Sequence, residues 1–199
     1  MYDPDDTTPL PWKSLSEEPL GDFSIFRLSS TVRRSPSTGR THGFIRVDAP
    51  DWVNVIAVTP DGGVVLVAQY RHGTDAVTLE IPGGAVDDGE SPLDAARREL
   101  EEETGYRAPS WEAIGCVEPN PAFMSNRCWT FLATGCILDG QPAPDPSEEL
   151  EVRTVPLPDF TELVDTGVIR HALVVAAHDH LRRGLARGAP WSRLAASAE

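Results

Sequence analysis

The sequence contains very little lysine and cysteine. Of its 17 basic residues 16 are arginine, and 31 aspartates and glutamates bring the formal net charge to −14. This balance argues against a protein that mainly grips a nucleic-acid backbone, because such binding needs clustered cations. The three cysteines are odd in number and lack a CxxC spacing, which disfavours both a disulfide framework and a structural metal site. We therefore expect a reducing, cytoplasmic setting.

Long apolar runs are missing as well. None approaches the roughly 18–20 residues that a membrane-spanning helix needs. The first six residues, MYDPDD, are acidic and lack the apolar core of a secretory signal, so we expect neither a signal nor a membrane anchor there. The content of 40% hydrophobic and 24% charged residues is ordinary for a globular protein, and 199 residues suit one generous domain.

The N-terminal region divides into two parts. Residues 1–20 are rich in Pro, Asp, Ser and Thr, which predicts a flexible acidic arm. Residues 22–48 carry short alternating runs that are interrupted by a turn-like segment at 35–39, which predicts a β-hairpin. Residues 21–199 are expected to form one domain, in which strands within 22–48 are available for dimerisation.

The remainder of the chain mixes strand and helix patterns without a break in composition. Two β-branched runs joined by Pro60-Asp61-Gly62-Gly63 predict a hairpin. The predicted strands are 53–59, 64–69, 77–81, 111–118, 128–134 and 151–155, and the predicted C-terminal helices are 159–165 and a stripe of apolar residues from 169 to 181. We therefore predict a single domain of the α/β or α+β class.

The most informative segment is a helix rich in carboxylates. Ser91-Pro92-Leu93-Asp94 is a typical helix start, and Gly105 is a natural stop. Three glutamates, Glu99, Glu102 and Glu103, are spaced i, i+3 and i+4 and line one face, where their like charges repel. A hard divalent cation relieves that repulsion best. A solvated acidic helix is the alternative interpretation.

Three further residues of this segment bear on the same interpretation. Arg98 is spaced to pair with Glu102 and to orient its carboxylate. Glu90, just before the helix, is placed to add a ligand from the loop. Glu101 points about 100° away from its neighbours, so it serves as an internal control for the others.

The complete spacing resembles the signature of the Nudix hydrolases at every fixed position. It consists of Gly84, five residues, Glu90, seven residues, and then RELEEETGY at 98–106, where Tyr106 replaces the usual aliphatic residue. The resemblance implies an α/β/α sandwich with a mixed β-sheet, preceded here by the N-terminal hairpin region. It also implies water-dependent hydrolysis of a pyrophosphate-linked nucleoside with Mg²⁺ or Mn²⁺.

The same resemblance assigns roles to the residues of this box. Glu99 and Glu103 become the principal metal ligands, and Glu102 becomes a further ligand or the general base. The carbonyl of Gly83 becomes an extra ligand, since a residue without a Cβ allows close approach to the backbone. In the ADP-ribose pyrophosphatase branch the base comes from a late loop, which corresponds to Asp145–Leu150. Glu148 and Glu149 remain equal candidates within it, and a solvated acidic loop is the alternative.

Features outside the box resemble the ADP-ribose and nucleotide-sugar pyrophosphatases. Gln69-Tyr70-Arg71 precedes LEIPGG at 79–84, and the resemblance assigns Arg71 and Glu80 to the nucleotide end of the substrate. Pro121 stands near a proline associated with preference for ADP-ribose. A rim salt bridge at Arg71 and a stiffened loop at Pro121 are the alternatives. The implied reaction converts ADP-ribose to AMP and ribose 5-phosphate, with GDP-mannose, NADH and dinucleoside polyphosphates as other candidate substrates.

Members of this branch are often homodimers that supply base-stacking aromatics across their interface. Trp12, Phe44 and Trp52 are candidates for that role, with Trp52 assigned to substrate binding, although aromatics beside strands more often lie in the core. Two other classes of function compete with the enzyme. One is a non-catalytic nucleotide-sugar sensor on the same fold, and the other is an acidic protein-interaction module.

Overall fold

The computed structural model describes residues 10–146 and 148–189, and these form two compact units. The first contains the described residues up to Pro50 together with Glu118–Asn126, and the second contains the remainder. The predicted single domain over residues 21–199 includes parts of both units, and its extent stays a prediction. The segment Glu118–Asn126 joins the first unit because Val47 exchanges backbone hydrogen bonds of 2.8 and 3.1 Å with Phe123 and Ser125.

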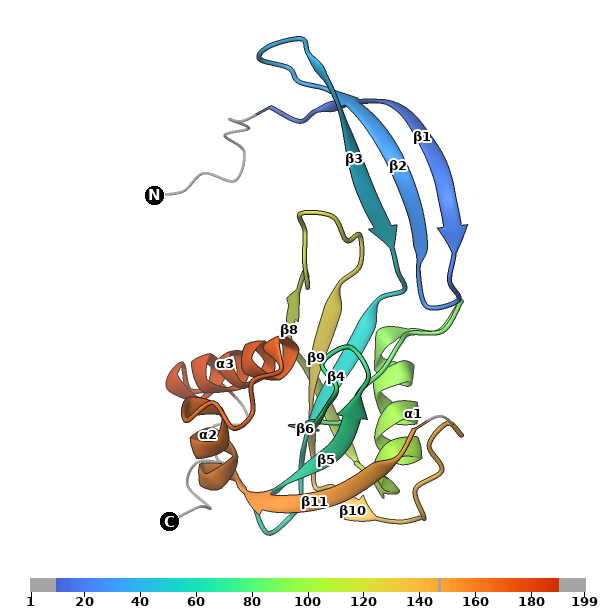
Figure 1. Cartoon of the computed structure of the whole chain (residues 1–199). Coiled ribbons are helices and arrows are strands. Elements are labelled where there is room, and N and C mark those ends of the chain that lie inside the picture. Colours follow the sequence, from blue (N-terminus) through green and yellow to red (C-terminus); the bar gives the residue numbers. More distant parts are fainter. Residues whose placement is uncertain (1–9, 147, 190–199) are drawn as a thin grey trace. The chain divides into compact units, whose positions relative to one another are not determined.

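The first unit is a three-stranded antiparallel sheet in the order β1-β2-β3 (Figure 1). Its strands are β1 (Lys13–Asp22), β2 (Arg27–Arg34) and β3 (Thr41–Asp48). The predicted hairpin within 22–48 is confirmed by β2 and β3. The predicted flexible arm is wrong for residues 13–20, which pair with β2, whereas residues 1–9 of that arm lie outside the described chain. Register shifts near Ser14 and Pro19 break the alternation of this strand, so its sequence pattern was not visible.

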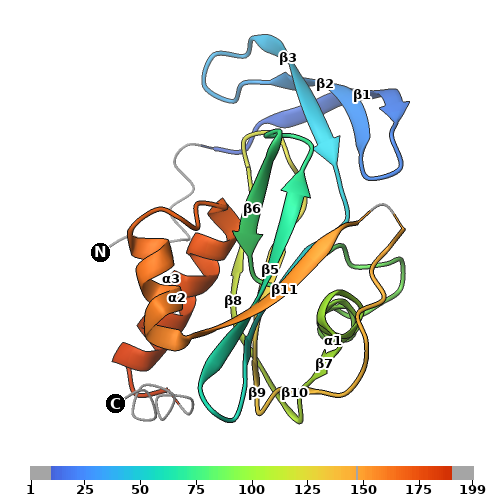
Figure 2. The same cartoon turned by 60° about the horizontal axis from the view of Figure 1, so that its bottom comes forward.

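The second unit is built on a six-stranded mixed sheet, with the order β11-β5-β4-β9-β8 and with β6 paired to β5 (Figure 2). Its central pair, β4 and β9, is parallel, and the other pairs are antiparallel. The strands are β4 (Trp52–Val58), β5 (Gly63–Arg71), β6 (Ala76–Glu80), β8 (Ser110–Val117), β9 (Cys128–Thr134) and β11 (Leu150–Pro156). A separate short pair joins β7 (Tyr106–Arg107) to β10 (Ile137–Leu138).

Helices cover both faces of this sheet. Figures 1 and 2 show α1 (Pro92–Thr104) on one face and α2 (Leu157–Asp165) and α3 (Ala172–Ala186) on the other. The core accordingly has two parts, one around Leu100 beneath α1 and one around Phe160 and Leu181 beneath α2 and α3. This arrangement confirms the predicted α/β/α layers, and the predicted strands and helices of this unit are all present. Ile169 is buried as expected but precedes α3 instead of lying on it.

The ends of α1 follow from the residues that predicted them. The side-chain oxygen of Ser91 accepts a hydrogen bond of 3.2 Å from the backbone N–H of Asp94. Gly105 adopts a left-handed conformation with φ of 71°, and its N–H donates to the carbonyl of Glu101 at 2.8 Å. These caps set the length of the helix, and therefore the position of its glutamates along the sheet.

The core beneath α3 provides a test of the fold. Leu181 is 1% exposed, and we expect Leu181→Ala to lower the free energy of unfolding by about 2–5 kcal/mol because it removes buried methyl groups and leaves a cavity. Urea denaturation measures this change. The matched control Leu138→Ala, at a site that is 61% exposed, should change stability by less than about 0.5 kcal/mol. Equal effects of the two substitutions would contradict the packing described here.

Candidate active site

The site is organised by an extended segment that follows β6 and runs beside β4. The N–H of Val53 donates to the carbonyl of Gly84 at 2.9 Å, and the N–H of Val55 donates to that of Pro82 at 2.8 Å. Between these bonds, a Cβ on Gly83 would lie 2.2 Å from the carbonyl oxygen of Val53. Only glycine allows the segment to approach β4 this closely.

This pairing turns Gly83 toward α1. Its N–H donates to Oε2 of Glu103 at 2.9 Å. Glu103 is 3% exposed, and burial raises its pKa to about 8 against the lowering effect of this hydrogen bond.

Arg98 holds the other carboxylates of the helix and the adjoining loop. Its guanidinium donates to Glu90 at 3.1 and 3.0 Å, to Glu99 at 2.8 Å and to Glu102 at 3.1 Å, and also to the carbonyl of Ala85. Burial raises the pKa of Glu99, and the charge of Arg98 opposes that shift. Gly84 contributes as well, because a Cβ there would lie 2.3 Å from the carboxylate of Glu99.

Glu101 behaves as the control that its position on the helix predicts. It forms an ion pair with Arg107, which also contacts Asp139 at 3.0 Å. Its side chain therefore belongs to a different cluster from that of Arg98. Three of the four glutamates in the run 99–103 thus face the Gly83 segment or Arg98, and the fourth does not.

A second group of polar residues lies on β5 and β6. Arg71 donates to both carboxylate oxygens of Glu80, at 2.9 and 2.7 Å, and the hydroxyl of Thr78 donates to the same carboxylate at 2.6 Å. Glu80 is 3% exposed, and although burial raises its pKa, these hydrogen bonds hold it below the usual value. Nε2 of His171 lies 3.8 Å from this carboxylate.

The sheet register places this group on the face that α1 covers. Val65 packs in the core beneath α1, and residues of β5 at even spacing from it, including Gln69 and Arg71, share that face. Thr78 is the partner of Gln69 in the antiparallel pair with β6, so it shares the face too, as does Glu80. The guanidinium–carboxylate pair and the glutamates of α1 are thus built on one side of the sheet.

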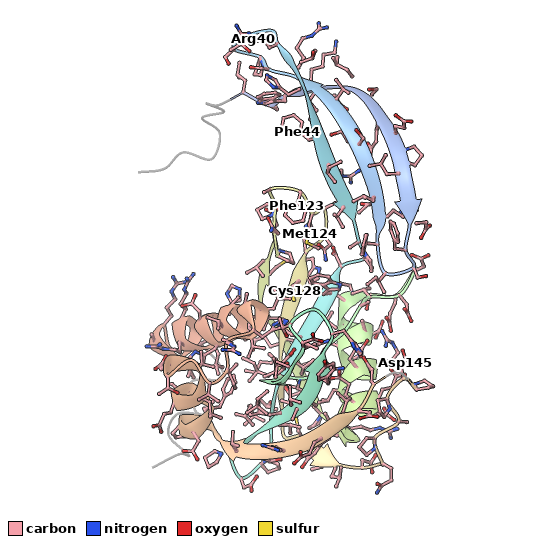
Figure 3. The ribbon with its side chains drawn as sticks, in the orientation of Figure 1. Arg40, Phe44, Phe123, Met124, Cys128 and Asp145 are labelled. Carbon is pink, nitrogen blue, oxygen red and sulfur yellow. The ribbon has the colours of Figure 1, made fainter. Side chains whose placement is uncertain are left out.

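The late loop contributes one of its two candidate glutamates to the same face. Leu150 pairs with Gln69 at the start of β11, so Glu148, two residues earlier, is on the side of Gln69. Its Oε1 lies 3.5 Å from Nε2 of Gln69, and its charge helps to raise the pKa of Glu99 and Glu103, in which burial is the larger cause. Glu149 is exposed. Figure 3 labels Asp145 in the same loop.

Comparison with known proteins agrees with this geometry. A family model described as NUDIX domain matches residues 50–177. The chain belongs to the Nudix family. It is 35% identical over 137 residues, 68% of this chain and 74% of the relative, to the ADP-ribose pyrophosphatase of Bacillus subtilis (strain 168). It is 33% identical over 180 residues, 81% of each chain, to the ADP-sugar pyrophosphatase of Mus musculus.

A solved structure supports the fold of this Nudix chain. The crystal structure of an ADP compounds hydrolase superposes with a TM-score of 0.78 and covers 89% of this chain and 95% of the other, at 23% identity. The predicted Nudix fold is therefore confirmed. Among residues 10–146 and 148–189, none of the helices combines the length and apolar character that crossing a membrane requires.

Nudix hydrolases generally use a divalent metal, and the residues of this site fit one in part. Glu103 is buried and Glu99 is partly buried, and a nearby cation would lower the raised pKa values of both carboxylates. Within the described part of the chain, no three side chains of His, Cys, Asp or Glu are grouped as a metal-binding cluster. A hard cation here would therefore take remaining ligands from the Gly83 carbonyl, water or substrate oxygens, as magnesium commonly does.

The two remaining predicted substrate residues of this Nudix chain belong to different units. Trp52 begins β4 and bridges to Ala85, on the path of the Gly83 segment. Pro121 belongs to the first unit, with β1–β3, whereas Arg71 and the glutamates belong to the second. Sequence reasoning gave no role to Gln69, Thr78 or His171. The alternation of side chains along β5 and β6 could have identified the first two, because it places Gln69 on the same face as Arg71 and Thr78 on the same face as Glu80.

A measurement of Mn²⁺ binding tests whether Glu99 and Glu103 are metal ligands. We expect Glu99→Gln and Glu103→Gln each to weaken Mn²⁺ binding by about tenfold or more, since each removes a charged oxygen donor. Electron paramagnetic resonance of free Mn²⁺ during a titration measures this. Glu101→Gln is the matched control on the same helix and should bind Mn²⁺ like the wild type. The assignment is wrong if all three variants bind equally well.

Proposed function

We propose that this protein hydrolyses the pyrophosphate bond of a nucleoside diphosphate sugar, and that ADP-ribose is its substrate, giving AMP and ribose 5-phosphate. The observation that carries the proposal is the position of Arg71 on the same sheet face as the glutamates of α1. A site with acids that suit a cation and a guanidinium that suits a phosphate matches a diphosphate ligand. The names of the two pyrophosphatases that the chain resembles support the same substrate class.

In this proposal Mg²⁺, or Mn²⁺ in its place, is held by Glu99, Glu103 and the Gly83 carbonyl, with Glu102 and Glu90 as further ligands. When bound, such a cation neutralises charge on the phosphates and lowers the pKa of an attacking water. Arg98 keeps Glu99 and Glu102 oriented, as its bonds of 2.8 and 3.1 Å to them support. The buried carboxylate of Glu103 is kept in place by the N–H of Gly83.

Glu148 is our choice for the general base. Its position on the face of Gln69 and its electrostatic effect on Glu99 and Glu103 support this role. Glu149 is exposed, and the register of β11 directs it to the other side of the strand. Glu102, the third candidate, is engaged by Arg98 at 3.1 Å, which suits a ligand better than a proton acceptor.

Arg71 and Glu80 are proposed to hold the nucleotide end of the substrate. Glu80 uses both of its oxygens to fix the guanidinium of Arg71, which limits the entropy that Arg71 loses on binding. Arg71 remains 40% exposed, so part of it is accessible to a ligand. Trp52 and Pro121 complete the proposed substrate residues, Trp52 as a stacking surface and Pro121 as a determinant of ADP-ribose preference.

We also propose a cytoplasmic homodimer that has neither a nucleic-acid nor a membrane partner. The sheet of β1–β3 exposes large apolar side chains, namely Leu15, Leu20, Phe44 and Ile45. Phe44 and Ile45 are neighbours on β3, so they expose apolar surface on opposite faces of this sheet, and such surface supports binding to another protein. Trp12 packs edge-to-face on Phe44 at 5.5 Å between ring centroids, which provides a fixed aromatic surface on this sheet. Figure 3 labels Phe44 on β3.

Hydrolysis is tested with ADP-ribose, GDP-mannose, UDP-glucose, NADH and a dinucleoside polyphosphate, each with Mg²⁺. We expect AMP and ribose 5-phosphate from ADP-ribose, identified by chromatography. Glu102→Gln and Glu103→Gln should each lower turnover about a hundredfold or more, because each weakens charge neutralisation at the phosphates. Glu101→Gln should retain it. Turnover of no substrate would favour the nucleotide-sugar sensor, and near-native turnover by the first two variants would refute their roles.

Light scattering after gel filtration tests the dimer. We expect the wild type at twice the mass of one chain, and Ile45→Glu shifted toward the monomer, because a charge would enter the apolar contact. Ile45 is 51% exposed and Ile137, on β10, is 55% exposed, so Ile137→Glu is a matched control that should remain dimeric. A wild type that is monomeric at all concentrations would contradict the proposal.

A further inference from the structure

Gln69 is a buried polar residue that the proposed chemistry does not yet use. It is 6% exposed at the end of the β5–β11 pairing, where its partner is the first residue of β11, and a buried position of this kind ordinarily holds an apolar side chain. Its Nε2 faces Oε1 of Glu148 at 3.5 Å. Its own Oε1 is buried and, among the residues that the structure describes, has no hydrogen-bond partner. A buried acceptor without a partner costs stability, so packing alone does not explain a glutamine here.

Backbone contacts before and after Glu148 in the chain place it beside Gln69. Leu150 is the register partner of Gln69, which places Glu148 just beyond the start of β11. The N–H of Glu148 donates to the carbonyl of Asp145 at 2.8 Å, so a turn supports it on the other side. Earlier in the loop, the N–H of Ala143 donates to the carbonyl of Glu102 at 2.7 Å, which ties the loop to α1.

These contacts fix the backbone of Glu148 but leave its side chain with several rotatable bonds. A carboxylate on such a chain sweeps a wide volume unless another group holds it. The amide of Gln69 is the donor that the structure offers, and β5 is a rigid element from which to offer it. Gln69 also lies two residues from Arg71 on the same face, so one strand positions groups for both substrate and base.

We propose that Gln69 is a positioning residue, which holds the Glu148 carboxylate at the site through its side-chain amide and directs its free Oε1 to a donor on bound water or substrate. The inference rests on the proposed function, since it concerns a step of that hydrolysis. Gln69 does not itself react with the substrate in this scheme. Its contribution is to keep Glu148 in the geometry that proton abstraction needs.

A double-mutant cycle on ADP-ribose hydrolysis tests this role. Gln69→Met keeps the length of the side chain and removes its amide donor, and Glu148→Gln removes the base. We expect Gln69→Met to lower kcat about 10- to 100-fold with KM changed less than about threefold, as misplaced catalytic groups do. In the Glu148→Gln background the same substitution should lower kcat less than about threefold, because the two residues act as one unit.

Controls separate this role from a structural one. Gln141→Met makes the same change at an exposed position shortly before the late loop and should leave kcat unchanged. The side-chain amide resonances of Gln69 in ¹H–¹⁵N spectra should shift in Glu148→Gln and stay in place in Glu149→Gln, a readout that needs no turnover. Circular dichroism confirms that each variant is folded.

Three other results would each contradict the role of Gln69, and each would point to a different reason. Additive losses in the cycle would show that Gln69 acts independently of Glu148, and a raised KM with normal kcat would make it a substrate-binding residue. Unchanged Gln69 resonances in Glu148→Gln would remove the contact itself. In these cases the wild type still hydrolyses its substrate, so the proposed function stands. A wild type without any hydrolysis would instead overturn the proposed function and the inference together.

Discussion

The approach of Gly83 to β4 is the constraint on which the site depends. A side chain at this position would collide with the carbonyl of Val53, so only glycine lets the segment after β6 continue the sheet. Because Val53 and Val55 engage the carbonyls on either side, the N–H of Gly83 is available to α1. The N–H of Gly83 then meets Glu103 and thereby aligns the helix with the strands that bear Arg71. A steric requirement at one atom thus determines the polar arrangement of the site.

The pKa values of the two buried acids Glu80 and Glu103 are shifted in opposite directions. Glu80 has Arg71 and Thr78 as donors, and these hydrogen bonds keep its pKa low despite burial. Glu103 has a backbone N–H and distant charges, and burial raises its pKa to about 8. The charge of Glu80 is already balanced by Arg71. Among the described residues Glu103 has no such adjacent side-chain cation, so a bound cation would favour its ionised form. The net charge of −14 therefore says little about ligands by itself, since what matters is which acids the fold leaves without a cation.

The local patterns of the sequence predicted most of the second unit and much of its site. The caps of α1 and the spacing of its glutamates follow short-range rules, so both were readable from Ser91 to Gly105. Which of Glu148 and Glu149 lies beside Gln69 was not readable, because it depends on the register of β11 against a strand about 80 residues earlier. β1 was missed because Pro19 and two register shifts hide its alternation. The place of Pro121 in the first unit is likewise set by long-range pairing, with Val47 and its neighbours.

The pairing of Leu150 with Gln69 has a consequence for how the length of this loop can change. Surface loops usually tolerate insertions and deletions. Here, with Leu150 still paired to Gln69, one residue removed or added between Glu148 and Leu150 would change the position of Glu148 relative to β11, and a different side chain would meet Gln69. Upstream of Ala143, which is tied to α1, the N–H groups of Asp139 and Gly140 donate to the carbonyl of Gly105 at 3.0 and 3.1 Å, so the chain is held to the end of this helix as well. Among descendants of this sequence, the few residues that precede β11 should therefore keep their number.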